Sequence, residues 1–137
     1  MDLNDREAWE LAMTRPIGRI AHVHEGRVFV FPINPLIDNR QIYLRAAEGS
    51  MVYEAARRNA AASLEIDDLF DWSKTGWSVL IQGNLSEVTE PQQIRSVLAR
   101  LQPWAGGIRN HVVRLTPQHI SGRSFQPKAG GVRTVTV

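Results

Sequence analysis

Hydrophobic and polar residues alternate with a period close to two along much of the chain, the pattern of strands with one buried face. Valine, isoleucine and phenylalanine are frequent in these stretches, and short turns at 24–27 and 38–40 separate some of them. We predict six strands, with a seventh candidate at 120–125 and a polar loop at 67–74. The six cover residues 18–24, 27–33, 41–45, 62–68, 77–89 and 111–115.

Three other stretches have apolar residues at helical spacing, and we predict helices at 5–13, 48–59 and 91–101. Most links between strands are of hairpin length. This order favours an antiparallel sheet that closes on itself with helices at its ends, a mainly β fold of the α+β kind. Residues 1–125 are predicted to form one domain. Residues 126–137 contain Pro127 and two glycines, and they are expected to be either a disordered tail or an arm in an oligomer.

The bulk properties narrow the class of protein. A chain of 137 residues fits one domain with a single core. The absence of cysteine excludes disulfides, thiolate zinc sites and cysteine nucleophiles. The net charge is +2 without a long run of like charges, so nucleic-acid binding is not supported. No apolar run is long enough to span a membrane and no secretory signal is visible, so we expect a cytoplasmic protein.

Two short strings carry the strongest chemical signal. Residues 44–51 are Leu-Arg-Ala-Ala-Glu-Gly-Ser-Met, a strand that ends in a Gly-Ser turn before a helix, and a helix start can hold a phosphate. Residues 75–83 are Thr-Gly-Trp-Ser-Val-Leu-Ile-Gln-Gly, a strand that opens with an aromatic ring and a hydroxyl. Together they predict a pocket for a flat, phosphorylated aromatic ligand. Helix capping by Ser50 and core packing of Trp77 would use the same residues.

Other kinds of site find little support. His22 and His24 lie two apart on one face of a strand, but no third ligand stands near them, so we predict no metal site. Residues 76–80 begin like the nucleophile elbow of a hydrolase, and Leu80 then stands where that turn needs glycine.

Several strings follow one another in a characteristic order, among them Phe-Pro-Ile-Asn at 31–34, Thr-Gly-Trp-Ser-Val at 75–79 and Ile-Ser-Gly-Arg at 120–123. In this order the chain resembles the pyridoxamine 5′-phosphate oxidase-like split-barrel flavoproteins, in their branch of small bacterial flavin-nucleotide-binding members. The resemblance implies a six-stranded antiparallel split β-barrel with short flanking helices. It also implies a homodimer that holds FMN in two equivalent clefts at the dimer interface.

The resemblance also assigns residues to the FMN site. Those residues are Pro32, Ile33 and Asn34 along the flavin, Arg45, Ala46, Gly49 and Ser50 at the phosphate and ribityl chain, Gly76, Trp77 and Ser78 near the ring, and Trp104 and Arg123 from the other subunit. Alternation along a strand points Ser78 and Trp77 to opposite sides, so Ser78 and the backbone are the stronger candidates near the ring.

Met51 departs from the family's pattern. In this branch the residue after Gly-Ser is usually a lysine that pairs with the phosphate, and here a methionine stands there. Losing one charge-assisted contact removes about 1.5–3 kcal/mol, roughly tenfold to hundredfold in affinity. Arg45 is expected to supply the charge through its forked guanidinium. If it does not, the cofactor binds weakly, is a different flavin-like molecule, or is absent.

Two functional hypotheses follow from the resemblance. The first is an FMN-dependent oxidoreductase that acts on an unidentified small molecule or a second cofactor. The alternative, favoured by Met51, is a non-catalytic dimer that carries a flavin, a deazaflavin or heme. Heme would need an axial ligand, and the candidates are His22, His24, His111 and His119. Pyridoxal phosphate synthesis is less favoured, because the biosynthetic members have a longer C-terminal segment with more basic and histidine residues.

Overall fold

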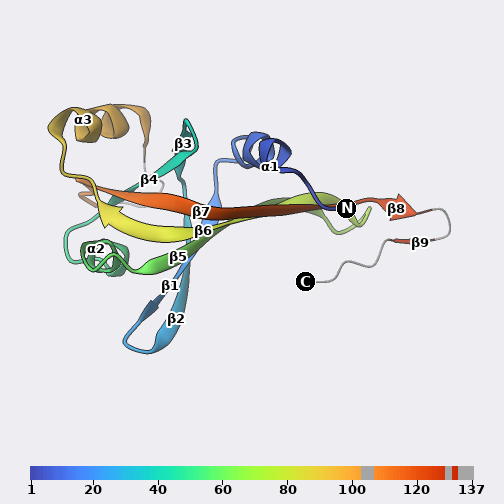
Figure 1. Cartoon of the computed structure of the whole chain (residues 1–137), viewed down its shortest axis with the longest axis horizontal. Coiled ribbons are helices and arrows are strands. Elements are labelled where there is room, and N and C mark those ends of the chain that lie inside the picture. Colours follow the sequence, from blue (N-terminus) through green and yellow to red (C-terminus); the bar gives the residue numbers. More distant parts are fainter. Residues whose placement is uncertain (103–106, 129–130, 133–137) are drawn as a thin grey trace.

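The computed structural model describes residues 1–102, 107–128 and 131–132. Its main feature is a seven-stranded antiparallel sheet with the strand order β2-β1-β5-β6-β7-β4-β3 (Figure 1). The strands are β1 (Gly18–His24), β2 (Arg27–Ile33), β3 (Leu36–Asp38), β4 (Gln41–Ala46), β5 (Ala61–Phe70), β6 (Thr75–Glu87) and β7 (His111–Phe125). The helices are α1 (Asp5–Ala12), α2 (Met51–Arg57) and α3 (Pro91–Arg100). A separate pair of two-residue strands, β8 (Pro127–Lys128) and β9 (Gly131–Val132), follows β7.

The two edge strands of the sheet follow each other in the sequence. β2 ends at Ile33, β3 begins at Leu36, and only Asn34 and Pro35 connect them. A link of this length spans roughly 11 Å at most. Because β2 and β3 lie at opposite edges of the sheet, the sheet must curl until those edges approach each other. The result is an incompletely closed, or split, barrel.

The antiparallel sheet and the flanking helices confirm the predicted fold class, and the strand count is corrected. β3 pairs only three residues with β4, which is too short to leave a pattern in the sequence, and it makes the sheet seven-stranded rather than six-stranded. The predicted loop at 67–74 is shorter than expected. β5 continues to Phe70 and β6 begins at Thr75, so these strands form one long hairpin.

The predicted strands at 111–115 and 120–125 are two halves of the single strand β7. Pro117 and its polar neighbours suggest a break in the sequence, but a β-bulge carries the strand through it. Gly83 on β6 pairs with Pro117 and Gln82 pairs with His119, so Gln118 is the extra residue. A Cβ atom at Gly83 would lie 1.9 Å from the Thr116 carbonyl oxygen, so only glycine fits opposite this bulge.

Two hydrophobic cores lie on opposite faces of the sheet. The larger core packs α1 and α2 against one face, and it includes Ile42 and Leu44 of β4. The smaller core packs α3 against Tyr43 and Val112 on the other face. Side chains alternate along a strand, so β4 contributes to both cores. No helix among the described residues is long and apolar enough to cross a membrane.

Each helix begins at a capping residue. Asn4 and Glu7 form a capping box at α1, and Glu90 caps α3 ahead of Pro91. The predicted helix at 48–59 begins later than expected, at Met51. Gly49 has a φ of +76° and Ser50 is extended, so the chain turns sharply before the first helical residue.

Candidate ligand-binding cavity

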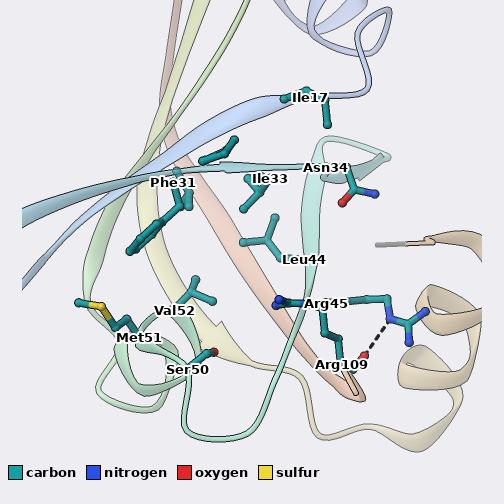
Figure 2. A pocket seen from close by; sticks show the side chains of 12 residues that line it. Ile17, Phe31, Ile33, Asn34, Leu44, Arg45, Ser50, Met51, Val52 and Arg109 are labelled. Atoms are coloured by element: carbon teal, nitrogen blue, oxygen red, sulfur yellow. Dashed lines mark hydrogen bonds between the residues drawn. The ribbon is translucent and has the colours of Figure 1, made fainter. Parts of the chain in front are cut away.

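A cavity of about 670 Å³ opens where the two edges of the split barrel approach each other (Figure 2). Its walls come from β2 and the link to β3, from β4, from the start of α2 and from residues beside β1 and β7. The described residues that line it are Ile17, Ile20, Phe31, Pro32, Ile33, Asn34, Leu44, Arg45, Ser50, Met51, Val52 and Arg109.

The body of the cavity is apolar. Ile20, Leu44 and Ile33 belong to or pack against the larger core, and Phe31 presents an aromatic ring from β2. Six of the thirteen residues predicted for the FMN site meet here, from three separate parts of the chain: Pro32, Ile33, Asn34, Arg45, Ser50 and Met51. Ligand sites of this size usually combine such apolar walls with a few placed polar groups.

Arg45 lies at the cavity, but its guanidinium is engaged elsewhere. Its Nε donates to the Arg109 carbonyl oxygen at 2.8 Å, and its Nη1 donates to the Leu101 carbonyl oxygen at 2.9 Å. The neighbouring side chains of Leu44 and Ala46 face the larger core, so strand alternation turns Arg45 toward the α3 side of the sheet. Asn34 is similarly engaged, because its amide donates to the Gln102 carbonyl oxygen at 2.7 Å.

Arg109 lines the cavity and was missed in the sequence. Figure 2 shows its side chain extending along β4 toward Leu44, in the direction opposite to the Arg45 guanidinium. The signal for it is non-local. His111 pairs with Ala46, so the residues just before β7 must lie beside the turn that follows β4. A single sequence does not display this register.

The start of α2 forms one end of the cavity. The Ser50 hydroxyl caps the helix by accepting the Tyr53 amide hydrogen at 3.3 Å, and Met51 and Val52 contribute apolar surface. Gly49 is exposed at the preceding turn, and the side chain of Ala46 is fully buried in the larger core. Neither Gly49 nor Ala46 is among the described lining residues.

The other predicted residues do not join this cavity within one chain. Gly76, Trp77 and Ser78 lie at the start of β6 and pair with residues near the end of β7. Trp77 packs against the larger core, and Ser78 pairs with Arg123, which is also part of β7. Trp104 lies outside the described residues.

A polar cluster behind α2 ties that helix to β6 and β7. The Tyr53 hydroxyl donates to Glu87 Oε2 at 3.0 Å, and the ring centroids of Tyr53 and His111 lie 4.3 Å apart. Burial, followed by the hydrogen bond to Glu87, raises the pKa of Tyr53. The phenol therefore keeps its proton and remains a donor, which holds the start of α2 against the sheet.

His22 lies behind the cavity wall. The residue is 3% exposed, and neither ring nitrogen has a hydrogen-bond partner among the described residues. Its ring packs near those of Phe29 and Phe31, with centroid distances of 6.4 and 6.2 Å. Burial lowers the pKa of His22, so its imidazole is neutral. None of the four histidines belongs to the described lining, so none of the predicted heme ligands is placed there.

Two carboxylates share one arginine on the face of the sheet away from the larger core. Arg19 Nη1 lies 3.1 Å from Glu65 Oε1 and 3.1 Å from Asp67 Oδ2. Partial burial, followed by the neighbouring Asp67, raises the pKa of Glu65 to about 7. Within the part of the chain that the structure describes, no three His, Cys, Asp or Glu residues form a group that could hold a metal ion.

A curled antiparallel sheet with a mainly apolar cavity at its open edge defines the class of split-barrel proteins. The sequence model of the pyridoxamine 5′-phosphate oxidase family matches residues 4–124, and the chain belongs to this family.

The chain is also similar to curated proteins and to solved structures. The uncharacterized protein Rv0080 of Mycobacterium tuberculosis is 29% identical over 126 residues, covering 89% of this chain and 83% of that protein. The solved structure of the FAD binding protein from Mycobacterium smegmatis is 31% identical, with a TM-score of 0.75, and the match covers 90% of this chain and 97% of that one. The FAD and heme binding protein from the same organism shares the fold, with a TM-score of 0.68 at 15% identity over 89% of this chain and 72% of that one.

Proposed function

We propose that this protein binds FMN in the cavity and is an oxidoreductase that acts on a small molecule. The observation that carries the proposal is the cavity itself, which joins an apolar body to two arginines and an asparagine in a chain of this family. The likeness to an FAD binding protein at 31% identity supports a flavin as the ligand class.

The residues present fit a flavin. The volume of about 670 Å³ lies within the range of roughly 300–1,000 Å³ found for small-molecule sites. Phe31, Ile33 and Leu44 offer apolar surface to a flat ring system. Asn34, in the link between β2 and β3, and Ser50, at the start of α2, add polar side-chain atoms to the lining. The residues that would hold the ring are therefore separate from those that would meet the polar end of the ligand.

A bound flavin would supply the electron or hydride chemistry, and the protein supplies binding and orientation. The described lining contains neither a carboxylate nor a histidine. The side chains of this chain thus act by excluding water from one side of the ring and by fixing its position. The groups that surround the open side of the cavity would decide which second reactant can reach the flavin.

We also propose that the active form is a homodimer. Val23, Val28 and Val30 are 53%, 71% and 57% exposed on neighbouring strands, and all three lie on the face of β1 and β2 that points away from the cavity-lining Phe31. An exposed apolar row on an edge strand favours association. Replacing Val30 with glutamate should shift the mass seen by light scattering from two chains to one, and an unchanged mass would count against this interface.

The first test is a visible absorbance scan of the purified protein, repeated after addition of FMN and desalting. Retained flavin bands support the proposal, and a colourless protein that keeps no FMN contradicts it. Deazaflavin and heme are added to parallel samples, because retention of either one in place of FMN would identify the carrier alternative. Bleaching of bound FMN by a reduced nicotinamide, with transfer to an added acceptor, then separates an oxidoreductase from a carrier.

A further inference from the structure

We propose that the imidazole of His22 is a hydrogen-bonding contact for the ring system of the cavity's ligand, and that the Phe31 ring covers this contact until a ligand displaces it. The proposal rests on the proposed flavin site and adds a polar residue to it. The ligand class is a planar heterocycle with a carbonyl oxygen or a ring N–H at its edge, and a flavin has both.

His22 occupies the next inward position on β1 beyond the cavity. Ile20 and Phe31 line the cavity, and they pair with each other across β1 and β2. Side chains alternate along a strand, so the next pair on the same face is His22 and Phe29, roughly 7 Å further along. The imidazole therefore lies one layer of side chains behind the cavity wall.

The imidazole is buried without the partners that a buried polar group normally has. His22 is 3% exposed, and in the described parts of the chain neither ring nitrogen has a hydrogen-bond partner. The Val23 backbone lies close enough to favour the charged form, but without the geometry of a hydrogen bond. A neutral imidazole has one N–H donor and one acceptor nitrogen. A buried polar group without a partner is destabilising, so a ligand that pairs with either nitrogen binds more tightly.

The Phe31 ring adjoins both His22 and the cavity. The ring centroids of Phe31 and His22 lie 6.2 Å apart, and Phe31 also stacks on Phe29 with 6.1 Å between centroids. Figure 2 shows the Phe31 ring reaching from β2 toward Met51 at the start of α2. Phe31 is 37% exposed on an edge strand that is paired on one side only, so its ring can turn without disturbing the fully buried core.

A turned Phe31 ring extends the cavity to the imidazole. A planar ligand on the apolar body of the cavity then points one edge at His22. Three polar residues of the lining, Asn34, Arg45 and Ser50, already make hydrogen bonds within the chain. His22, in contrast, offers a donor and an acceptor that are both unused within the described residues.

The contact is tested by FMN titration of His22 variants at neutral pH. For His22→Phe we expect FMN affinity to fall roughly tenfold, because the new ring fills the space without a polar atom. His22→Gln keeps a donor and an acceptor and should recover part of the affinity. His119→Phe, an exposed position on β7, is the matched control and should leave the affinity unchanged.

Urea unfolding of the same variants separates a ligand contact from a structural role. His22→Phe replaces two unpaired polar atoms with apolar surface, so its unfolding midpoint without ligand should equal or exceed that of the natural protein. A histidine that only stabilises the fold predicts the reverse, a lower midpoint together with the weaker binding. That result would overturn the proposal.

NMR of isotope-labelled histidine side chains detects the contact itself. Saturation with FMN should shift the ring nitrogen signals of His22, which are assigned by their loss in His22→Phe. The signals of the exposed His119 should stay in place. Unchanged His22 signals in the FMN-saturated protein would overturn the proposal.

The cover is tested without flavin, by modification with diethyl pyrocarbonate and mass spectrometry. This reagent modifies neutral imidazoles that it can reach, so His22 should be protected in the natural protein and modified in Phe31→Ala. Val30→Ala, the neighbouring position on the opposite face of β2, is the control and should keep His22 protected. Continued protection in Phe31→Ala would show that Phe31 is not the cover.

The outcomes separate this inference from the proposed function. If the natural protein binds FMN and His22→Phe binds it equally well, the role of His22 is wrong while the flavin site stands. If the natural protein binds no FMN, the proposed function fails and the ligand contact fails with it. The modification experiment still decides in that case whether Phe31 covers His22.

Discussion

The centre of the sheet and its open edge are built differently. β5, β6 and β7 pair along most of their lengths, and their inward side chains, such as Leu64, Ile81 and Leu115, are fully buried. No residue of the edge strand β2 is fully buried, and three of its residues, Phe31, Pro32 and Ile33, line the cavity. The stability of the fold therefore resides in the centre, and the edge keeps apolar surface available for a ligand or a second chain.

The largest expected effect is on the stability of the centre. Ile81→Ala removes a fully buried side chain from β6, and we expect the free energy of unfolding to fall by about 2–5 kcal/mol. Urea unfolding followed by circular dichroism measures it. The control is Arg27→Ala at the exposed edge strand β2, where the expected change is within about 0.5 kcal/mol. Similar losses at both positions would remove the distinction between centre and edge.

A substitution in the cavity wall should separate binding from stability. Phe31→Ala removes an aromatic ring that lines the cavity, and an aromatic contact is worth about 0.5–1.5 kcal/mol beyond area burial. We therefore expect FMN affinity to fall roughly tenfold, measured by fluorescence titration. The free energy of unfolding should change less than in Ile81→Ala, because Phe31 is 37% exposed whereas Ile81 is fully buried. An unchanged affinity would place the ligand elsewhere.

Acid should lower the free energy of unfolding through His22, which lies on β1 next to the edge strand β2. Burial lowers the pKa of His22 from 6.5 in the folded state, whereas the unfolded chain binds the proton at the ordinary value. The unfolded state therefore binds more protons below pH 6.5, and stability falls as pH falls through that value. His22→Phe should flatten this loss in urea unfolding across pH, and His119→Phe, an exposed control, should not. Arg58 and His24 also disfavour the charged form.

A second effect of pH comes from Glu65 and has the opposite sign. The pKa of Glu65 is raised from 4.5 to about 7, so the folded state holds a proton that the unfolded state has lost between these values. This contribution to stability is complete below pH 4.5 and is lost as pH rises toward 7. Glu65→Gln should remove that slope, whereas Glu10→Gln on α1 should leave it. A slope that persists in Glu65→Gln would show that another group takes up the proton.

Local patterns predicted the elements well where each element carries its own signal. The bounds of β1 and β2 agree with the predicted strands, because alternation and turn residues mark both ends. β3 has three residues and no periodicity, so pairing with β4 alone creates it. β7 was divided in two because Pro117 is a local break signal, and only the partner strand shows that a bulge accommodates it.

The candidate site likewise combines residues that a local sequence pattern indicates with residues that only strand pairing brings there. Ser50 and Met51 could be singled out from the Gly-Ser turn in the sequence, and both line the cavity. Arg109 could not, since its place beside β4 depends on pairing between strands far apart in the sequence. The direction of the Arg45 side chain depends likewise on which carbonyl oxygens fold against it.

The sequence by itself determined which segments become strands and helices and which of their faces are apolar, because these properties depend on neighbouring residues. The tertiary structure decided which strands lie at the edges, how the sheet curls to form the cavity, and which residues line that cavity. Those features depend on strand order and register, which are set by the free energy of packing the whole chain and leave no mark in a local stretch of residues.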